Sequence, residues 1–389
     1  MKSRKNKGYK IQNYGRIFDS SERRRKKRAR NSVLFVLSIL VLVFLGYSIS
    51  GPLTNLLSGQ KTPRPSDTSS KAPTSSQMTS SEIKDIALES EKPSTLSDYK
   101  AAFLPLATAS DSIELSEFIK SIKAQGYNAA VLELKNEDGT IFYATQNTMA
   151  AEVKAVSETA ITNLPEIISK LKSENIVPIA NIHAFKDKIA TKNKDAKILY
   201  EGKENWSWFD SANGKPWLNP YRSAAQDYII SLSCELVDLG FENIMVSSVM
   251  FPDVRSFKFA DFGELEKTVS HAEILTQFAT KLKTAVNEKK AKLLLCYDAF
   301  KAQEENNVVY GGANPSTFSA DALVPALSVY TENSSQIAEI VSSLKLGATP
   351  LMPKFIFAEG TNKEQIDAQK ELCKDCSIYI FDKNGNYIG

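Results

Sequence analysis

Short apolar runs alternate with helix-like stretches from about residue 99 to the end of the sequence. Most of these runs are continuously apolar, which is typical of parallel strands whose two faces are both covered. We predict eight strands, at 101–108, 128–135, 176–185, 242–252, 291–300, 323–330, 349–358 and 377–381. Predicted helices between them cover 112–125, 163–174, 223–239, 264–289, 334–346 and 362–373. This pattern predicts an α/β fold, a (β/α)8 TIM barrel, with a doubly wound open sheet as the alternative.

The segment Val33–Ile49 contains no charged residue and consists mainly of Leu, Val, Ile and Phe. With the low-charge residues up to 57, a helix rising about 1.5 Å per residue covers a hydrocarbon core of about 30 Å. Residues 1–31 hold 13 Lys or Arg against two acidic residues, and basic segments stay on the cytoplasmic side. We therefore expect a single-pass cell-membrane protein with a cytoplasmic N-terminus and an extracellular C-terminal domain. A cleaved signal peptide is the alternative, but no A-x-A motif follows the segment.

These features divide the chain into four predicted parts. They are a basic cytoplasmic tail (1–31), a transmembrane signal-anchor (32–57), a Ser/Thr/Pro-rich linker (58–97) and the barrel (98–389). The linker composition cannot bury enough apolar surface to fold. The basic tail is explained by topology and contact with anionic lipids, so we predict no nucleic-acid partner.

The sequence offers little for metal or cofactor binding. It has four cysteines and two histidines, and its single C-x-x-C pair, Cys373 and Cys376, has no second pair. We therefore predict no metal site and leave open whether this pair forms a local disulfide or remains two thiols. No Gly-rich phosphate loop follows a predicted strand, so we predict no nucleotide and no other cofactor.

In a barrel of this kind, ligands bind where the strands end. The second strand ends with Glu133 and Lys135, whose spacing of two predicts that they share a face; they are either ligand contacts or a buried ion pair. His183, at the end of the third strand, is either a general base or ligand contact, or a hydrogen-bonded packing residue. Asp298 follows the fifth strand, where capping of the next helix is the alternative to catalysis.

All three tryptophans lie within residues 206–217. Aromatic faces stack on sugar rings while Asp and Asn bind hydroxyls, so this tract fits a saccharide site. The candidate ligand contacts here are Asp210, Trp217 and Asn219. The alternative is a loop that the tryptophans anchor against the barrel.

Four stretches together resemble a known family: NAAVLELKNEDGTIFY, IVPIANIHAFKD, WFDSANGKPWLNP and GFENIMVSSVMFP. They are similar to the bacterial family described as a "putative glycosyl hydrolase domain", whose second-strand pattern matches Glu133, Lys135, Asp138 and Gly139. The resemblance implies a (β/α)8 glycosidase-like domain and a carbohydrate ligand.

The fourth strand departs from this family. Where the family pattern ends in Asp-Tyr-apolar-Arg-Phe-Pro, this chain has SSVMFP at 247–252, so Ser247 replaces the expected acid. Glycosidases ordinarily need two carboxylates, and the sequence therefore favours a non-hydrolysing pseudoenzyme that binds cell-envelope polysaccharide or a partner. The alternatives are an active hydrolase using Glu133 and Asp298, and a structural envelope protein that binds another protein.

Overall fold

The computed structural model describes residues 96, 98–211, 214–254, 257–330, 333–357 and 363–382. The segments expected to form the cytoplasmic tail and the membrane anchor, and nearly all of the linker, lie outside the described residues. None of the helices that the structure describes combines the length and apolar character needed to span a bilayer.

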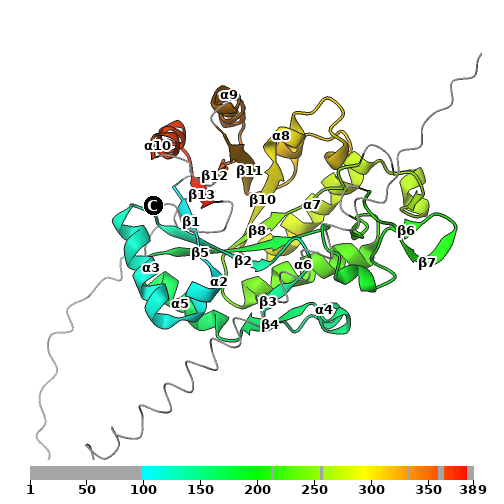
Figure 1. Cartoon of the computed structure of the whole chain (residues 1–389), viewed down its shortest axis with the longest axis horizontal. Coiled ribbons are helices and arrows are strands. Elements are labelled where there is room, and N and C mark those ends of the chain that lie inside the picture. The colour runs from blue at the N-terminus through cyan, green and yellow to red at the C-terminus, as the bar shows by residue number, and fades with distance from the viewer. Residues whose placement is uncertain are drawn as a thin grey trace, which may run out of the picture. The chain divides into compact units, whose positions relative to one another are not determined.

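The described part is an α/β fold built around a mixed sheet (Figure 1). Its parallel strands follow the spatial order β1-β13-β12-β11-β10-β8-β5-β2, and β1 pairs with β2 as well as with β13, so these pairings close into a ring. All eight predicted strand positions are confirmed. Their bounds are β1 Lys100–Phe103, β2 Ala129–Lys135, β5 Val177–His183, β8 Asn243–Ser247, β10 Lys292–Asp298, β11 Ala322–Val329, β12 Lys354–Phe357 and β13 Ile378–Asp382.

Helices occupy the predicted intervals between these strands. Each buries an apolar stripe, as in α5, where Ile167, Ile168 and Leu171 face the sheet while lysines lie in the last turn. A capping box of Ser270 and Glu273 fixes the start of α7. The long helices are α3 Ser112–Ala124, α5 Leu164–Ser173, α6 Ser223–Asp238, α7 His271–Glu288, α9 Ser334–Lys345 and α10 Lys363–Leu372.

Several elements lie outside the eight predicted strands and six predicted helices. The first strand is shorter than expected because Pro105, which has no N–H to donate to a strand pairing, precedes helix α2 (Leu106–Ser110). Strands β3 (Ile141–Tyr143) and β4 (Val156–Ile161), with α4 (Thr148–Val153) between them, extend the sheet beyond β2. A separate small sheet joins β6 (Leu199–Tyr200), β7 (Lys203–Ser207) and β9 (Ala260–Asp261).

Between β10 and β11 the chain forms only the short helix α8 (Ala299–Ala302) and the 3₁₀ turns η4 (Val308–Tyr310) and η5 (Pro315–Thr317). The long helix that covers other strand connections is therefore replaced here by four residues of α-helix and irregular chain. Because this connection lacks a long helix, a cavity remains on the outer side of β10 and β11.

The core has two layers separated by the ring of strands. The outer layer packs the helices against the sheet. The inner layer fills the ring with side chains, so the ring is a packed core rather than a pore. Its members include Tyr99, Ala101, Val131, Ile179, Met245, Leu294, Val324, Met352 and Tyr379.

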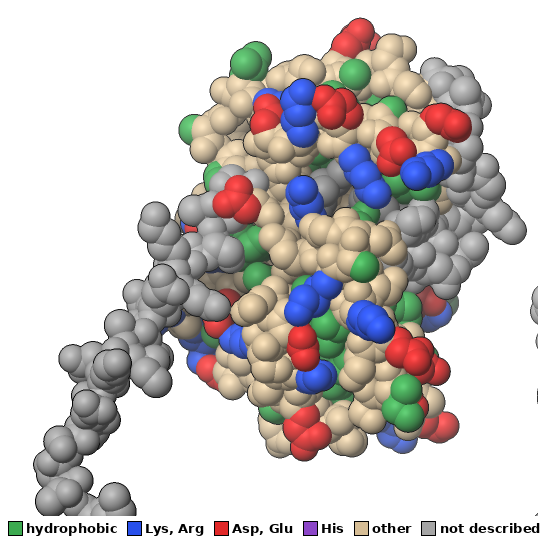
Figure 2. All heavy atoms as spheres, turned by 90° about the vertical axis from the view of Figure 1, so that its left-hand side faces the viewer, with side chains coloured by type: hydrophobic (Ala, Val, Ile, Leu, Met, Phe, Trp, Pro, Cys, Tyr) green, Lys and Arg blue, Asp and Glu red, His purple; other side chains and the backbone are tan. Residues whose placement is uncertain are grey.

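The surface is charged without segregation of sign. Figure 2 shows the side that lies on the left in Figure 1, where basic and acidic side chains are interspersed. Exposed pairs such as Lys123 and Glu174, 3.2 Å apart, join neighbouring helices. Pairs of this kind contribute about 0–1 kcal/mol each, so the stability of the fold rests on the two core layers.

Candidate functional site

A polar cluster lies inside the ring at the carboxyl ends of β2, β5 and β8. Glu133 and Asn181 are paired neighbours on β2 and β5, which brings the Glu133 side chain next to His183. His183 Nε2 lies 3.5 Å from Glu133 Oε2, and His183 Nδ1 is hydrogen-bonded to Ser248 Oγ at 2.8 Å. Ser248 has a φ of 57°, a conformation rare outside glycine that is often found at functional sites. Of the predicted site residues, Glu133 and His183 are therefore brought together.

The carboxyl group of Glu133 has a lowered pKa. Burial raises its pKa, but the hydrogen bond with His183 and the charges of His183 and Lys354 outweigh that effect and hold it below the ordinary value. Glu133 is therefore ionised at neutral pH and is an acceptor for hydroxyl groups. With 31% of its side chain exposed, it remains accessible to a ligand.

Ser247, at the end of β8, also faces the inside of the ring, because it lies two residues after Met245 of the inner core layer. Its Oγ donates a hydrogen bond to Asn181 Oδ1 at 2.8 Å, and both residues are buried. Burial raises the pKa of the neighbouring Cys296 thiol, against opposing effects of the Lys354 charge and a hydrogen bond with Ser247. The end of the fourth strand therefore contributes a neutral hydroxyl to the cluster.

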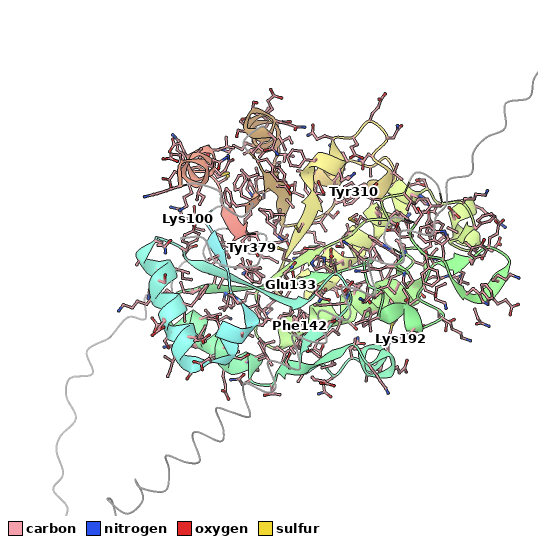
Figure 3. All side chains as sticks on the ribbon, viewed as in Figure 1. Lys100, Glu133, Phe142, Lys192, Tyr310 and Tyr379 are labelled. Carbon is pink, nitrogen blue, oxygen red and sulfur yellow. The ribbon has the colours of Figure 1, made fainter. Side chains whose placement is uncertain are left out.

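Lys354 and Tyr379 complete the cluster from β12 and β13. Lys354 Nζ lies 5.4 Å from the centre of the Tyr379 ring. Burial and the nearby Glu133 charge raise the pKa of Tyr379, and Figure 3 shows both Glu133 and Tyr379 in the central region. The sequence did not point to Lys354 or Tyr379 as site residues. Lys354 could have been found by its spacing of two from Met352: because Met352 faces the ring interior and successive residues of a strand face opposite sides, Lys354 also faces the interior.

Lys135 does not share a face with Glu133, and that prediction is wrong. A register shift between Glu133 and Lys135 marks a β-bulge, which turns the lysine to the outer side of the ring. There Lys135 Nζ lies 2.9 Å from Asp187 Oδ2, and both side chains are completely buried. The buried ion pair that the structure contains therefore joins Lys135 to Asp187, and not to Glu133 as the alternative from the sequence had it.

Asp298 caps helix α8. Its Oδ1 accepts hydrogen bonds from the backbone N–H groups of Phe300 and Lys301, both at 3.0 Å. The residue is exposed at the carboxyl end of β10, so the capping alternative describes its contacts. A catalytic role for Asp298 remains a prediction without a contact to Glu133 to support it.

The tryptophan-rich tract is largely anchored rather than open. Trp217 is 3% exposed, Asp210 is buried, and Asn219 donates to the Phe262 carbonyl and accepts from the Tyr221 N–H. These contacts favour the anchoring alternative for the three predicted ligand contacts. Trp206, on β7, is 67% exposed and is the tryptophan available for stacking.

The fold places the chain among α/β domains built on a ring of parallel strands. Residues 101–308 match the family model described as "Putative glycosyl hydrolase domain", and the chain belongs to this family. No curated protein matches the sequence significantly.

One solved structure supports the fold, and two others show weaker similarity. The glycoside hydrolase domain of PgaB (BpsB) from Bordetella bronchiseptica is 12% identical, with a TM-score of 0.53 over 75% of this chain and 95% of that one. A hypothetical protein from Ruminiclostridium thermocellum is 22% identical over 51% of this chain and 97% of its own, with a TM-score of 0.43. The glycoside hydrolase domain of PelA from Pseudomonas aeruginosa is 13% identical over 75% and 97%, with a TM-score of 0.42. At these identities the PgaB match is evidence for the fold alone.

Proposed function

We propose that the ring of strands is a (β/α)8 barrel that binds a cell-envelope polysaccharide at the carboxyl ends of its strands without hydrolysing it. The family membership supports a carbohydrate ligand, and the PgaB likeness supports the barrel fold. The polar cluster around Glu133 supplies the hydrogen-bonding groups that a glycan needs: a carboxylate acceptor, an imidazole, hydroxyls and a lysine ammonium.

The observation that carries the non-hydrolysing proposal is Ser247, a neutral hydroxyl at the end of β8 where the family pattern has an acid. Glycoside hydrolysis ordinarily requires a carboxylic acid with a raised pKa and a second carboxylate across the scissile bond. The lowered pKa of Glu133 makes it a poor proton donor, and Ser247 stands where the family pattern has an acid. Asp298, the other candidate acid, is engaged as a helix cap. Binding is therefore the activity that this arrangement supports best.

A glycan array with the full-length chain in detergent tests this proposal, together with a reducing-end assay on every glycan that is bound. We expect retention of at least one envelope polysaccharide with no release of reducing ends. Turnover that is lost on Glu133→Gln or Asp298→Asn would instead establish an active hydrolase. Failure to bind any glycan, with specific capture of one envelope protein, would favour the structural alternative.

The membrane topology is part of the proposal. We propose that Val33–Ile49 anchors the chain with its N-terminus in the cytoplasm and the domain outside the cell, on the basis of the apolar length and the basic flank.

Protease added to intact cells is expected to cut within residues 58–97 and release the domain as a soluble fragment, because Ser/Thr/Pro-rich chain is readily cleaved. Immunoblotting of the supernatant measures the release, with a cytoplasmic protein as the control for lysis. A linker cut only after the cells are permeabilised would reverse the proposed orientation.

A further inference from the structure

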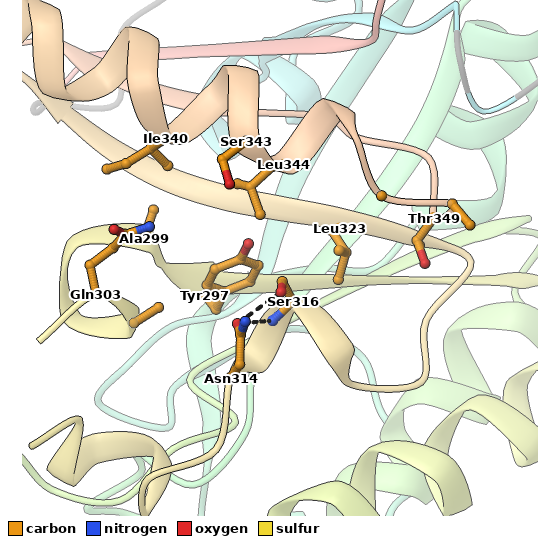
Figure 4. A pocket seen from close by; sticks show the side chains of 13 residues that line it. Tyr297, Ala299, Gln303, Asn314, Ser316, Leu323, Ile340, Ser343, Leu344 and Thr349 are labelled. Atoms are coloured by element: carbon orange, nitrogen blue, oxygen red, sulfur yellow. Dashed lines mark hydrogen bonds between the residues drawn. The ribbon is translucent and has the colours of Figure 1, made fainter. Parts of the chain in front are cut away.

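A cavity of about 220 Å³ lies on the outer side of the ring, between the segment around α8 and helix α9 (Figure 4). It occupies the place that a longer helix after β10 would cover. Buried Tyr297, Leu323 and Ile340 contribute to its floor, and exposed Gln303, Asn314 and Ser343 lie at its rim. The cavity is on the opposite side of the β10 strand from Cys296 and the polar cluster, because Tyr297 and Cys296 point to opposite faces.

The hydroxyl group of Tyr297 has no hydrogen-bond partner within the described residues, although the side chain is only 5% exposed. Figure 4 shows this hydroxyl directed toward α9 across the cavity. Burial raises the pKa of Tyr297, so the group keeps its proton and is available as a donor. A buried hydroxyl without a partner is destabilising, and a bound molecule in the cavity would satisfy it.

The lining indicates the chemistry of that molecule. None of the residues lining the cavity carries a charge, which selects against ionic ligands. Amide and hydroxyl groups at the rim face an apolar floor, the combination that suits a ring with hydroxyls on its edge and C–H groups on its face. Pockets for drug-sized ligands measure about 300–1,000 Å³, so this smaller cavity fits a single ring.

We propose that this cavity is a second carbohydrate site, which binds one neutral sugar unit and is separate from the cluster around Glu133. The Tyr297 hydroxyl donates to a sugar oxygen, and the rim amides and hydroxyls bind the remaining hydroxyls. The proposal does not depend on whether the Glu133 cluster binds glycan.

Saturation-transfer NMR of the full-length chain in detergent tests the site with glucose and N-acetylglucosamine as probes, and with glucuronate as a charged comparison. We expect saturation transfer to a neutral sugar, with affinity about tenfold lower in Tyr297→Phe because one hydrogen bond is lost. Tyr200→Phe, which removes a hydroxyl from the distant β6 strand, is the matched control and leaves the affinity unchanged.

Two further variants make the outcome decisive. Ala302→Leu fills the cavity, and in a Glu133→Gln background, where the ring interior contributes less, it is expected to abolish the remaining transfer. Transfer that disappears in Glu133→Gln but not in Tyr297→Phe would assign the sugar to the ring interior and overturn the proposal. So would the absence of transfer to either neutral sugar in the unmodified chain. The melting temperature of Tyr297→Phe is expected to equal or exceed that of the parent; a lower value would indicate a structural water in place of a ligand.

Discussion

Replacing Asp187 by asparagine is expected to lower the free energy of unfolding by about 3–5 kcal/mol, because it leaves a buried ammonium group without its counter-charge. Lys135 and Asp187 are 2.9 Å apart with both side chains inaccessible to solvent. Lys135 Nζ also donates to the His183 carbonyl at 2.6 Å, so it cannot turn toward water without breaking the end of β5. Urea titration of the full-length chain in detergent, followed by tryptophan fluorescence, measures the change.

The double variant Lys135→Met/Asp187→Leu separates charge from packing. Replacing both members of a buried pair by apolar residues of similar volume is often neutral or stabilising, so most of the lost stability should return. Glu174→Gln, which breaks the exposed pairs with Lys123 and Lys170, is the control and is expected to leave the stability nearly unchanged. A double variant as unstable as Asp187→Asn would show that shape, not the uncompensated charge, causes the loss.

The family-like second-strand pattern divides into two physical roles. Gly139 has a φ of 92°, and a Cβ there would lie 1.9 Å from Asp187 Oδ1, so the turn after β2 needs glycine to make room for the buried pair. Lys135 and Gly139 therefore serve the packing of the outer layer, whereas Glu133 faces the ring interior. The second-strand pattern is continuous in the sequence, but Lys135 and Gly139 stabilise the fold, whereas Glu133 belongs to the candidate site.

The strand positions were predictable because each strand is a compact apolar run, a signal contained in a few consecutive residues. The bulge at the end of β2 was not, because it depends on how β2 pairs with β5 rather than on local composition. Residues two apart in a regular strand share a face, but the bulge lies between Glu133 and Lys135. The prediction that they share a face was therefore wrong.

The contribution of Lys354 and Tyr379 could not be predicted for a related reason. These residues lie near Glu133 only because β13 pairs with β1, which joins residues some 280 positions apart in the sequence. Periodicity predicts that a strand exists but not which of its faces points inward. The replacement of an acid by Ser247 was found from the family pattern, whereas its hydrogen bond to Asn181 became visible only in the structure.

Glu133→Gln is expected to weaken glycan binding about 10- to 100-fold, because hydrogen bonds to a charged group contribute about 1.5–3 kcal/mol. The substitution preserves the size of the side chain but removes the charge that His183 and Lys354 face. Isothermal titration of the full-length chain in detergent, with the polysaccharide selected on the array, measures the loss. Asp298→Asn is the matched control, since it alters the other carboxylate of the hydrolase alternative, which caps helix α8, and is expected to leave the affinity unchanged.

The pH dependence gives the same prediction an independent test. Because the pKa of Glu133 in the folded protein lies below 4.5, its charge, and the stability and binding that depend on that charge, are fully present above pH 4.5. Both are lost only as the pH falls through the lowered value. The contribution of Glu133, measured as the affinity ratio of the parent to Glu133→Gln, should therefore stay constant from pH 7 to pH 5 and shrink at more acidic pH. A ratio that instead falls between pH 7 and pH 5 would mean that Glu133 takes up a proton near neutrality, as the acid of a working hydrolase does, and the non-hydrolysing proposal would then be wrong.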